Sequence, residues 1–340
     1  MGYHLLVVDF DPKKKANIDE WNKLRKSLSD VTKKRWKLFG SDIEHESMHS
    51  PKRYAHYFKL GYYLFRKRKS IDSIVSMQQF YGIVFSFFCS LFHGKHTTKN
   101  IIISFIYNEK SGAAGKLYHR FIERAVSSPY VDQLIVHSKS EVDYYAKLFP
   151  KAREKFIYVP LGITDDSAHY YQYDENEQKE KYILSVGNSN RDFDFLMDSL
   201  KDTEYKVRIF SDRVEDETKG NITTHKGVSV PEYYKQMSNC FCSVIPLSDP
   251  NISSGQLVML QSYAFKKPVI ITASNVNQSY TDQQSAIVID KTKGDLLAAL
   301  QKLEDEEYYD HQISAAHDYF EQEFSMEAFG KHIGEVYNVL

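Results

Sequence analysis

The sequence is poor in cysteine and has no long uninterrupted apolar segment. Its 340 residues include three cysteines, Cys89, Cys240 and Cys242, whose spacing fits neither a disulfide framework nor a metal site. We therefore expect a reducing compartment, the cytoplasm. The longest apolar run, residues 81–92, is shorter than the roughly 20 residues that cross a bilayer, and we find no signal-peptide pattern. These absences indicate a chain that is soluble or lies on a membrane surface.

Common motifs for nucleotides and metals are also missing: the sequence has no G-x-G-x-x-G, no P-loop and no H-E-x-x-H. His93 and His96 flank a Gly-Lys pair, but no third ligand is near, so we expect loop histidines. Two D-x-D strings, at residues 9–11 and 192–194, resemble a metal motif. We discount both, because the second opens a predicted helix, where acids favour the helix dipole.

The net charge of −1 conceals an asymmetry between the halves. In residues 1–164, Lys and Arg outnumber Asp and Glu by 28 to 15, whereas in residues 165–340 the acids outnumber the bases by 30 to 16. Opposite charge in the two halves predicts two domains with different partners. The length of the chain also favours two domains.

Within the basic half, cations and aromatic rings are interleaved, with no acid between Glu46 and Asp72. Such a segment suits an anionic membrane surface, and it equally suits a solvated helical face whose rings pack on the core. A nucleic-acid surface would use the same electrostatics, but no recognition motif supports it and we expect no such partner. The residues predicted to face a membrane or an acceptor are Lys52, Arg53, Arg66, Lys67, Arg68 and Lys69.

Predicted strands alternate with predicted helices in both halves, which indicates an α/β fold with parallel, doubly wound sheets. In the first half the expected strands are 5–8, 71–76, 100–105, 133–137 and 156–159. An acidic, tyrosine-rich stretch, residues 165–180, is the expected linker. In the second half the expected strands are 182–186, 206–210, 241–246, 268–272 and 286–290.

The strongest local signal lies in residues 245–261, where a strand, a small polar loop and a helix follow one another. Free backbone N–H groups at the start of such a helix bind phosphate, and Gly255 would let phosphate approach the backbone. We expect Gly255→Val to block phosphate binding and to leave the fold largely intact. The alternative is an N-capped helix without a ligand.

Here the residues carry a resemblance. Residues 255–271 resemble the donor-binding signature of family-4-type GT-B glycosyltransferases, and residues 186–192 resemble their phosphate loop. Residues 136–141 and 159–163 resemble the segments that close their N-terminal domain, and 320–337 resemble their closing helices. The resemblance implies two facing Rossmann-like domains and a C-terminal helix that returns to the first. The implied domains are an acceptor-binding domain over residues 1–164 and a nucleotide-sugar-binding domain over 181–315, joined by the linker 165–180. Closing helices over 316–340 would pack towards the first domain.

The resemblance also implies the donor site. Its residues would be Gly187, Arg191, Gly227, Ser253, Ser254, Gly255, Gln256 and Gln261. Members of the family often carry two glutamates where this sequence has Ser253 and Gln261, and an arginine where it has Asn188. These departures leave the fold and donor binding better supported than retaining stereochemistry. Arg191 could instead be a surface ion-pair partner of Asp192 or Asp194.

The implied function is transfer of a sugar from a nucleotide-diphosphate sugar, in most such enzymes a UDP-sugar, to a lipid-linked or polysaccharide acceptor. Surface polysaccharide synthesis at the inner face of the plasma membrane would be the setting. The resemblance implies that no metal or other cofactor is required, because in such enzymes cations and helix N–H groups stabilise the leaving diphosphate. An inverting enzyme would need a base, for which Asp9, Glu109 and His137 are candidates. The alternatives are an inactive GT-B scaffold that binds a glycan or a partner enzyme, and an epimerase or phosphorylase of the same architecture.

Overall fold

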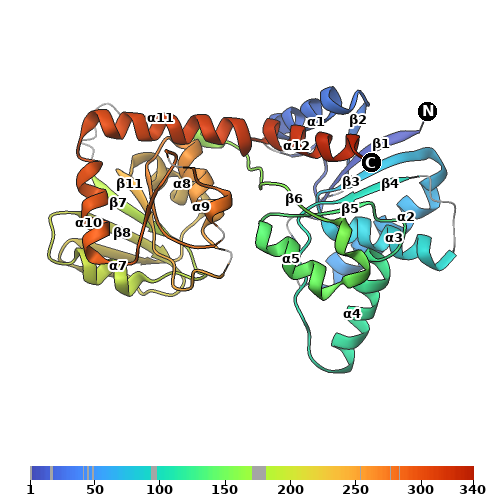
Figure 1. Cartoon of the computed structure of the whole chain (residues 1–340), viewed down its shortest axis with the longest axis horizontal. Helices are drawn as coiled ribbons and strands as arrows, with labels where there is room; N and C mark the ends of the chain where they lie inside the picture. Colours follow the sequence, from blue (N-terminus) through green and yellow to red (C-terminus); the bar gives the residue numbers. More distant parts are fainter. Residues whose placement is uncertain are drawn as a thin grey trace. The chain divides into compact units, whose positions relative to one another are not determined.

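The structure is a computed structural model. It describes residues 2–15, 18–40, 42–43, 46–47, 50–92, 98–170, 181–252, 254–275, 277–282 and 284–340. The chain divides into two compact units, one made of Met1–Leu161 with Met326–Leu340 and the other of Gly162–Ser325 (Figure 1). Of the predicted linker, 165–170 lie in the second unit, including the short helix α6 (Ser167–Tyr170), and 171–180 fall outside the described residues.

The first unit contains a six-stranded, fully parallel sheet in the order β2-β1-β3-β4-β5-β6. The strands are β1 (Tyr3–Val8), β2 (Trp36–Gly40), β3 (Ile71–Ser76), β4 (Lys99–Ile102), β5 (Gln133–Val136) and β6 (Phe156–Tyr158). The helices are α1 (Ile18–Thr32), α2 (Pro51–Lys67), α3 (Gln79–Phe92), α4 (Gly112–Val126), α5 (Lys139–Leu148) and α12 (Met326–Asn338). The strand order reverses between β1 and β3, which is where ligands bind in such sheets.

Helices cover both faces of this sheet because alternate residues of β1 point to opposite sides. Leu6 packs in a cluster with side chains of α1 and α12. Leu5 and Val7 pack in another cluster with side chains of α2 and α3. The parallel, doubly wound sheet that the sequence predicts is confirmed.

Helix α12 completes the first unit although it ends the chain. Two of its glycines let it lie directly on α1: a Cβ at Gly330 would lie 2.4 Å from the carbonyl oxygen of Leu24, and one at Gly334 would lie 2.8 Å from Cβ of Val31. The predicted return of the C-terminal helix to the N-terminal domain is thus seen in α12. Helix α11 (Glu306–Glu323) belongs to the second unit.

The second unit contains a seven-stranded sheet in the order β13-β12-β11-β7-β8-β10-β9. Its strands are β7 (Tyr182–Val186), β8 (Lys206–Ser211), β9 (Glu217–Lys219), β10 (Ile222–Lys226), β11 (Cys242–Ile245), β12 (Val269–Thr272) and β13 (Ile287–Ile289). Its further helices are α7 (Phe193–Leu200), α8 (Val230–Asn239), α9 (Gln256–Ala264) and α10 (Lys293–Lys302). Apart from the antiparallel edge strand β9, this is the dinucleotide-binding strand order, with its reversal between β7 and β11.

Candidate functional site

The loops that follow β7 and β11 are joined to each other at the reversal of the second sheet. The amide N of Asp192 donates to the carbonyl oxygen of Pro246 at 2.9 Å. The side chain of Asn190 donates to the carbonyl oxygen of Asp249 at 2.9 Å and accepts from the amide N of Asp249 at 2.8 Å. These bonds fix the two loops side by side at the carboxyl edge of the sheet, where α/β proteins bind ligands.

Arg191 lies beneath these loops and is 5% exposed. Its Nε donates to the carbonyl oxygen of Val186 at 3.1 Å, and its Nη1 donates to the carbonyl oxygen of Ser189 and to Oγ of Ser254, each at 2.9 Å. Burial lowers the pKa of Arg191 to about 10, so the guanidinium is still charged at neutral pH. The structure therefore brings Arg191 and Ser254 together, as expected of residues that share one ligand.

The alternative that Arg191 is a surface ion-pair partner is wrong. Within the described residues no carboxylate lies in ion-pair range of its guanidinium. Asp192 instead caps α7 by accepting from the amide N of Phe195 at 3.0 Å and pairs with Nζ of Lys291 at 2.7 Å. Asp194 is exposed. The buried guanidinium thus carries a positive charge that no described acid neutralises.

Gly187 and Gly227 follow β7 and β10 with positive φ angles of 133° and 71°. A Cβ at Gly187 would lie 2.8 Å from Nη2 of Arg191, so only glycine lets the guanidinium pack against this loop. Gly227 donates through its amide N to the carbonyl oxygen of Ser211 at 3.2 Å. Gln256 begins α9, and the predicted donor residue Ser253 lies outside the described residues.

Gly255 is the N-cap of α9 and adopts a left-handed conformation with φ +93°. A Cβ there would lie 3.0 Å from Cγ2 of Ile245 in the strand below. This geometry argues against the expectation that Gly255→Val leaves the fold largely intact. The glycine is required by its own backbone and by the packing beneath it, whether or not phosphate binds.

We expect Gly255→Val to lower the free energy of unfolding of the second unit by about 2–5 kcal/mol. A non-glycine residue in the left-handed region costs roughly 1–2 kcal/mol, and overpacking against Ile245 adds about 1–3 kcal/mol. Chemical denaturation measures the loss. Gly220→Val is a control for backbone strain alone, because Gly220 also has positive φ but has no neighbour within 4 Å of a Cβ. Equal losses in the two variants would contradict the packing argument.

Gln261 is already bonded on both sides within the second unit. Its Oε1 accepts from the hydroxyl of Tyr233 at 2.7 Å, and its Nε2 donates to the hydroxyl oxygen of Tyr234 at 3.2 Å. The hydroxyl of Tyr234 in turn donates to Asp166 at 3.3 Å. The amide thus joins α8 to α9, and its contact with a ribose stays a prediction. Neither tyrosine was predicted as a site residue, although both directly follow the S-x-x-E pattern of residues 229–232.

No protein-family model matches this sequence, and no curated protein matches it either. Solved structures do match. HepE of Anabaena in complex with UDP has a TM-score of 0.62 and 11% identity over all of both chains. Sucrose-phosphate synthase from Thermosynechococcus elongatus has a TM-score of 0.61 and 13% identity over 100% of this chain and 99% of that one. The lipopolysaccharide outer core galactosyltransferase WaaB has a TM-score of 0.56 and 12% identity over all of both chains.

The chain has the GT-B fold. The fold that the resemblance implied is confirmed, and the carboxyl edge just described belongs to the second Rossmann-like domain of this GT-B protein. Among the residues that the structure describes, no group of three His, Cys, Asp or Glu side chains could hold a metal ion. His93 and His96, which the sequence predicts to be loop histidines, lie outside the described residues.

In the first domain of the GT-B fold, Asp9 follows β1 at the reversal of the sheet. Its Oδ2 lies 2.6 Å from Nη2 of Arg53, whose Nε donates to the hydroxyl of Tyr57 at 2.5 Å. Arg53 is 4% exposed, so its assignment to a membrane-facing surface is wrong. One carboxylate oxygen of Asp9 is thus engaged by Arg53.

The other two candidate bases follow different strands of the same sheet. Nδ1 of His137 donates to the carbonyl oxygen of Val159 at 2.9 Å, which leaves Nε2 to accept from Oγ of Ser104 at 2.7 Å. Burial lowers the pKa of His137, so the imidazole is neutral. Glu109 is exposed in the loop between β4 and α4. Of the three, only Glu109 has neither an ion pair nor a hydrogen bond among the described residues.

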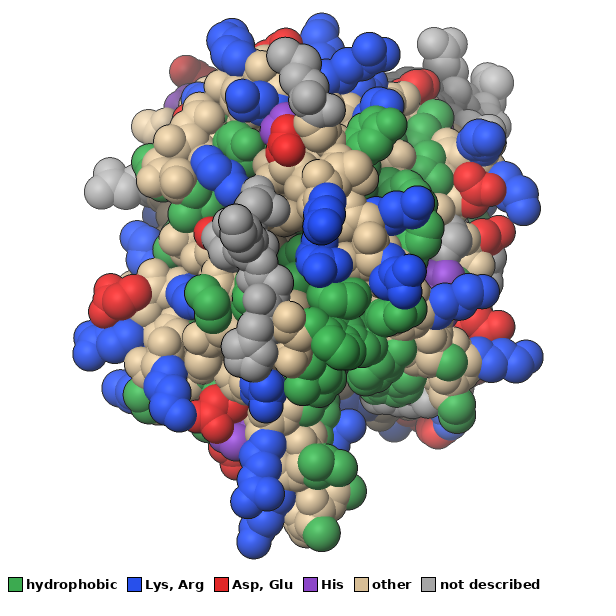
Figure 2. All heavy atoms as spheres, turned by 90° about the vertical axis from the view of Figure 1, so that its right-hand side faces the viewer, with side chains coloured by type: hydrophobic (Ala, Val, Ile, Leu, Met, Phe, Trp, Pro, Cys, Tyr) green, Lys and Arg blue, Asp and Glu red, His purple; other side chains and the backbone are tan. Residues whose placement is uncertain are grey.

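The basic segment of the first domain forms α2, and one side of it is open to solvent. Exposed rings of α2 continue into the exposed end of α3. We call this set the α2–α3 patch, and its members are Phe58, Tyr62, Tyr63, Leu91 and Phe92. Figure 2 shows an apolar area bordered by Lys and Arg side chains on the face that carries these helices.

The cations around the patch differ in exposure. Lys52, Arg66, Lys67 and Lys69 are exposed. Arg68 is half-buried, with its guanidinium 4.2 Å from the ring centroid of Phe65. Part of this segment is therefore a helical face that packs side chains on the core, and a membrane-facing role for its exposed residues stays a prediction. Within the described part of the chain, no helix is long and apolar enough to cross a membrane.

Proposed function

We propose that this protein transfers a sugar from a UDP-sugar bound at the carboxyl edge of the second domain. The observation that carries the proposal is the unneutralised guanidinium of Arg191, held between the Gly187 loop and the Ser254 turn at the reversal of the sheet. A diphosphate is the group that such a cation and the start of α9 would bind together. HepE, which shares the fold, has been solved with UDP and with UDP-glucose.

In the proposed reaction the diphosphate gains negative charge as the glycosidic bond breaks. Nη2 of Arg191 makes no hydrogen bond within the described residues, so it is free to donate to a phosphate oxygen. The first N–H groups of α9 have no carbonyl partner within the helix and add backbone donors. Both groups are held in place before the substrate arrives, so their stabilisation needs no rearrangement during the reaction.

A panel of nucleotide-sugars tests this function. A ligand at a hundred times its Kd stabilises a protein by about 2.7 kcal/mol, which thermal unfolding detects. We expect UDP-sugars to stabilise the wild type against thermal unfolding. We also expect UDP to be released faster when a purified acceptor is present than by slow hydrolysis of the UDP-sugar alone. Stabilisation by UDP-sugars without transfer or hydrolysis would favour the inactive scaffold. Conversion of the nucleotide-sugar alone would indicate an epimerase, and a need for inorganic phosphate would indicate a phosphorylase.

The proposed acceptor is lipid-linked or polysaccharide, presented at an anionic inner membrane face during assembly of a surface polysaccharide. The support is the α2–α3 patch with exposed cations beside it, since aromatic rings enter the interface and cations attract anionic headgroups. WaaB, a protein with the same fold, is named as a lipopolysaccharide outer core galactosyltransferase.

Removing two rings from the patch should weaken binding to anionic vesicles by tenfold or more. Phe92 and Phe58 are 62% and 42% exposed, and moving one such side chain out of water contributes roughly 1.5–3 kcal/mol when it is complete. Vesicle flotation compares Phe58→Ser/Phe92→Ser with wild type. The control is Val230→Ser/Val288→Ser, which removes exposed apolar side chains of the second domain.

Flotation should also fade as salt rises, because exposed charges are screened. Equal retention on neutral and anionic vesicles, or an equal loss in the control, would count against a membrane-facing patch. DNA binding of similar strength would favour a nucleic-acid surface.

The proposed transfer retains the anomeric configuration of the donor. The resemblance to family-4-type enzymes is the support, and the absence of glutamate at positions 253 and 261 weakens it. The proton NMR signal of the anomeric centre in the product decides between the outcomes. An inverted product would require a base, and Glu109 is then the candidate to replace first, because Asp9 is ion-paired and both ring nitrogens of His137 are hydrogen-bonded.

A further inference from the structure

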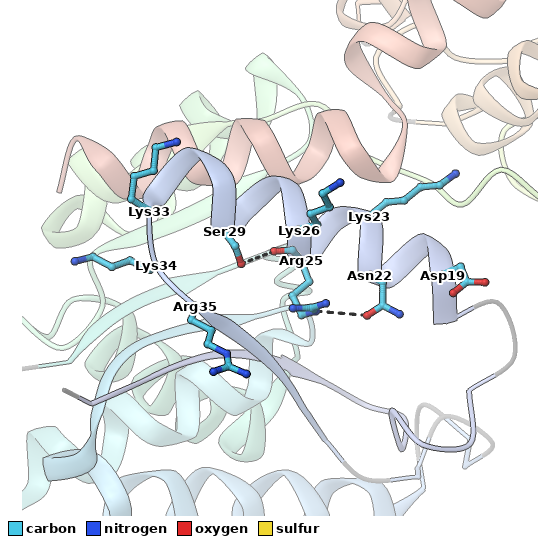
Figure 3. A pocket seen from close by; sticks show the side chains of 9 residues that line it. All are labelled: Asp19, Asn22, Lys23, Arg25, Lys26, Ser29, Lys33, Lys34 and Arg35. Carbon is cyan, nitrogen blue, oxygen red and sulfur yellow. Dashed lines mark hydrogen bonds between the residues drawn. The ribbon is translucent and has the colours of Figure 1, made fainter.

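A basic hollow of about 550 Å³ lies on the first domain, between α1 and the turn that leads into β2. Figure 3 shows its lining side chains, which come from α1 and from the three residues before β2. They are Asp19, Asn22, Lys23, Arg25, Lys26, Ser29, Lys33, Lys34 and Arg35. No role was predicted for any of them, and the hollow is separate from the Arg191 site in the second domain.

Most of the positive charge in the hollow has no acidic partner within the described residues. Six of the nine lining residues are Lys or Arg, and Asp19 is the one acid among them. Lys23 pairs with Glu20 at 2.6 Å. Within the described residues, no carboxylate lies in ion-pair range of Lys26, Lys34 or Arg35. Like charges gathered in this way repel one another, so an anion bound among them would relieve the repulsion.

The backbone that carries these cations is rigid. The indole Nε1 of Trp36 donates to Oγ1 of Thr32 at 2.9 Å, and the hydroxyl of Thr32 donates to the carbonyl oxygen of Leu28 at 2.7 Å. Lys33 makes the turn with a left-handed φ of +54°. Helix α1 is itself held by the close contact with Gly330 of α12. The cations therefore stand on a fixed scaffold, which lowers the entropy lost when a ligand binds.

We propose that this hollow binds an anion that carries two or more phosphate groups. Guanidinium groups such as those of Arg25 and Arg35 match phosphate oxygens with paired donors, and lysines add point charges. The volume lies within the range of small-ligand pockets. Two sources supply this chemistry, a soluble polyphosphate compound and a lipid headgroup with two phosphates. The proposal does not depend on sugar transfer by the second domain.

Isothermal titration with tripolyphosphate at low salt tests the site. We expect Lys34→Gln/Arg35→Gln to weaken binding at least tenfold. The matched control, Lys151→Gln/Arg153→Gln, removes a Lys and an Arg of the same domain that do not line the hollow, and it should stay within twofold of wild type. Arg191→Ala should also retain binding at the hollow, which separates this site from the proposed donor site. All changed side chains of the two double variants are exposed or partly exposed, so folding should persist.

Vesicles of equal total charge identify the source. A preference for cardiolipin over phosphatidylglycerol that Lys34→Gln/Arg35→Gln abolishes would indicate a headgroup, and no preference alongside intact tripolyphosphate binding would indicate a soluble ligand. Tripolyphosphate affinity that is equal in the two double variants would overturn the proposal. Loss of binding only in Arg191→Ala would place the phosphate in the second domain and would overturn it too, as would DNA binding through these residues without tripolyphosphate binding.

Discussion

Arg191→Ala should lower kcat/KM for the UDP-sugar by about ten- to a hundredfold. A hydrogen bond to a charged group contributes roughly 1.5–3 kcal/mol, and about 1.4 kcal/mol corresponds to tenfold. Part of the loss should appear in kcat, because the diphosphate is more negative in the transition state than in the bound substrate. Steady-state kinetics with varied donor separate the two contributions.

The burial of Arg191 adds a second expected effect. Its guanidinium satisfies the carbonyl oxygens of Val186 and Ser189, and the substitution would leave both without this partner. We expect the second domain to lose about 1–3 kcal/mol of stability. Kinetics must therefore be measured below the unfolding transition of the variant, as monitored by circular dichroism.

Ser254→Ala is the matched variant, because it removes one partner of Arg191 and keeps the cation. It should lose less donor affinity than Arg191→Ala while the loops still meet through Asn190 and Asp249. Folded Arg191→Ala protein with wild-type kcat and donor KM would refute the phosphate assignment. It would leave Arg191 as a cross-link between two loops.

Arg53→Ala should lower stability and Lys52→Ala should not, although the two residues are adjacent in the chain. Arg53→Ala removes the partner of Asp9, and breaking a buried ion pair costs about 3–5 kcal/mol. Since the side chain of Asp9 is 28% exposed, we expect about 2–3 kcal/mol, below that range. Lys52 is exposed, so Lys52→Ala should change stability by less than about 0.5 kcal/mol.

On anionic vesicles the order should reverse. Lys52→Ala should weaken the binding free energy to anionic vesicles by about 1 kcal/mol, or roughly fivefold in affinity, because it removes a cation near the membrane surface. Arg53→Ala should leave the binding of the folded protein unchanged. Urea denaturation and flotation of both variants give four values. A stability loss in Lys52→Ala similar to that in Arg53→Ala would contradict the difference in burial.

Local patterns in the sequence predicted much of the architecture. The sequence carries an S-x-x-E pattern at Ser138 and at Ser229, which is typical of a helix N-terminus. Both serines cap helices, with each Oγ accepting from the amide N of the glutamate three residues later. Apolar β-branched runs became buried strands of parallel sheets. These features depend on neighbours within one turn or one strand, which is why sequence alone reveals them.

The burial of Arg53 and several short or weakly marked elements were not predicted from the sequence. Arg53, Tyr57, Gly61 and Leu64 all lie on the buried side of α2, and their spacing is that of one helical face. Its charge groups Arg53 with the exposed cations, whereas its position in the helical period places it among the buried side chains. Helix α1 and strand β2 were not predicted, and the edge strand β9 is too short to stand out.

By itself the sequence determined the α/β class, the two-domain organisation and the contrast between a basic first half and an acidic second half. It also determined which loops lie at the carboxyl edge of the second sheet. Only the tertiary structure decided which charges are neutralised. Asp9 meets Arg53 across 44 positions of the chain, Arg191 reaches Ser254 across 63, and Gln261 is bonded to two tyrosines of another helix. Such contacts depend on which strands are neighbours in a sheet and on how helices pack over it, and no local spacing in the chain encodes that geometry.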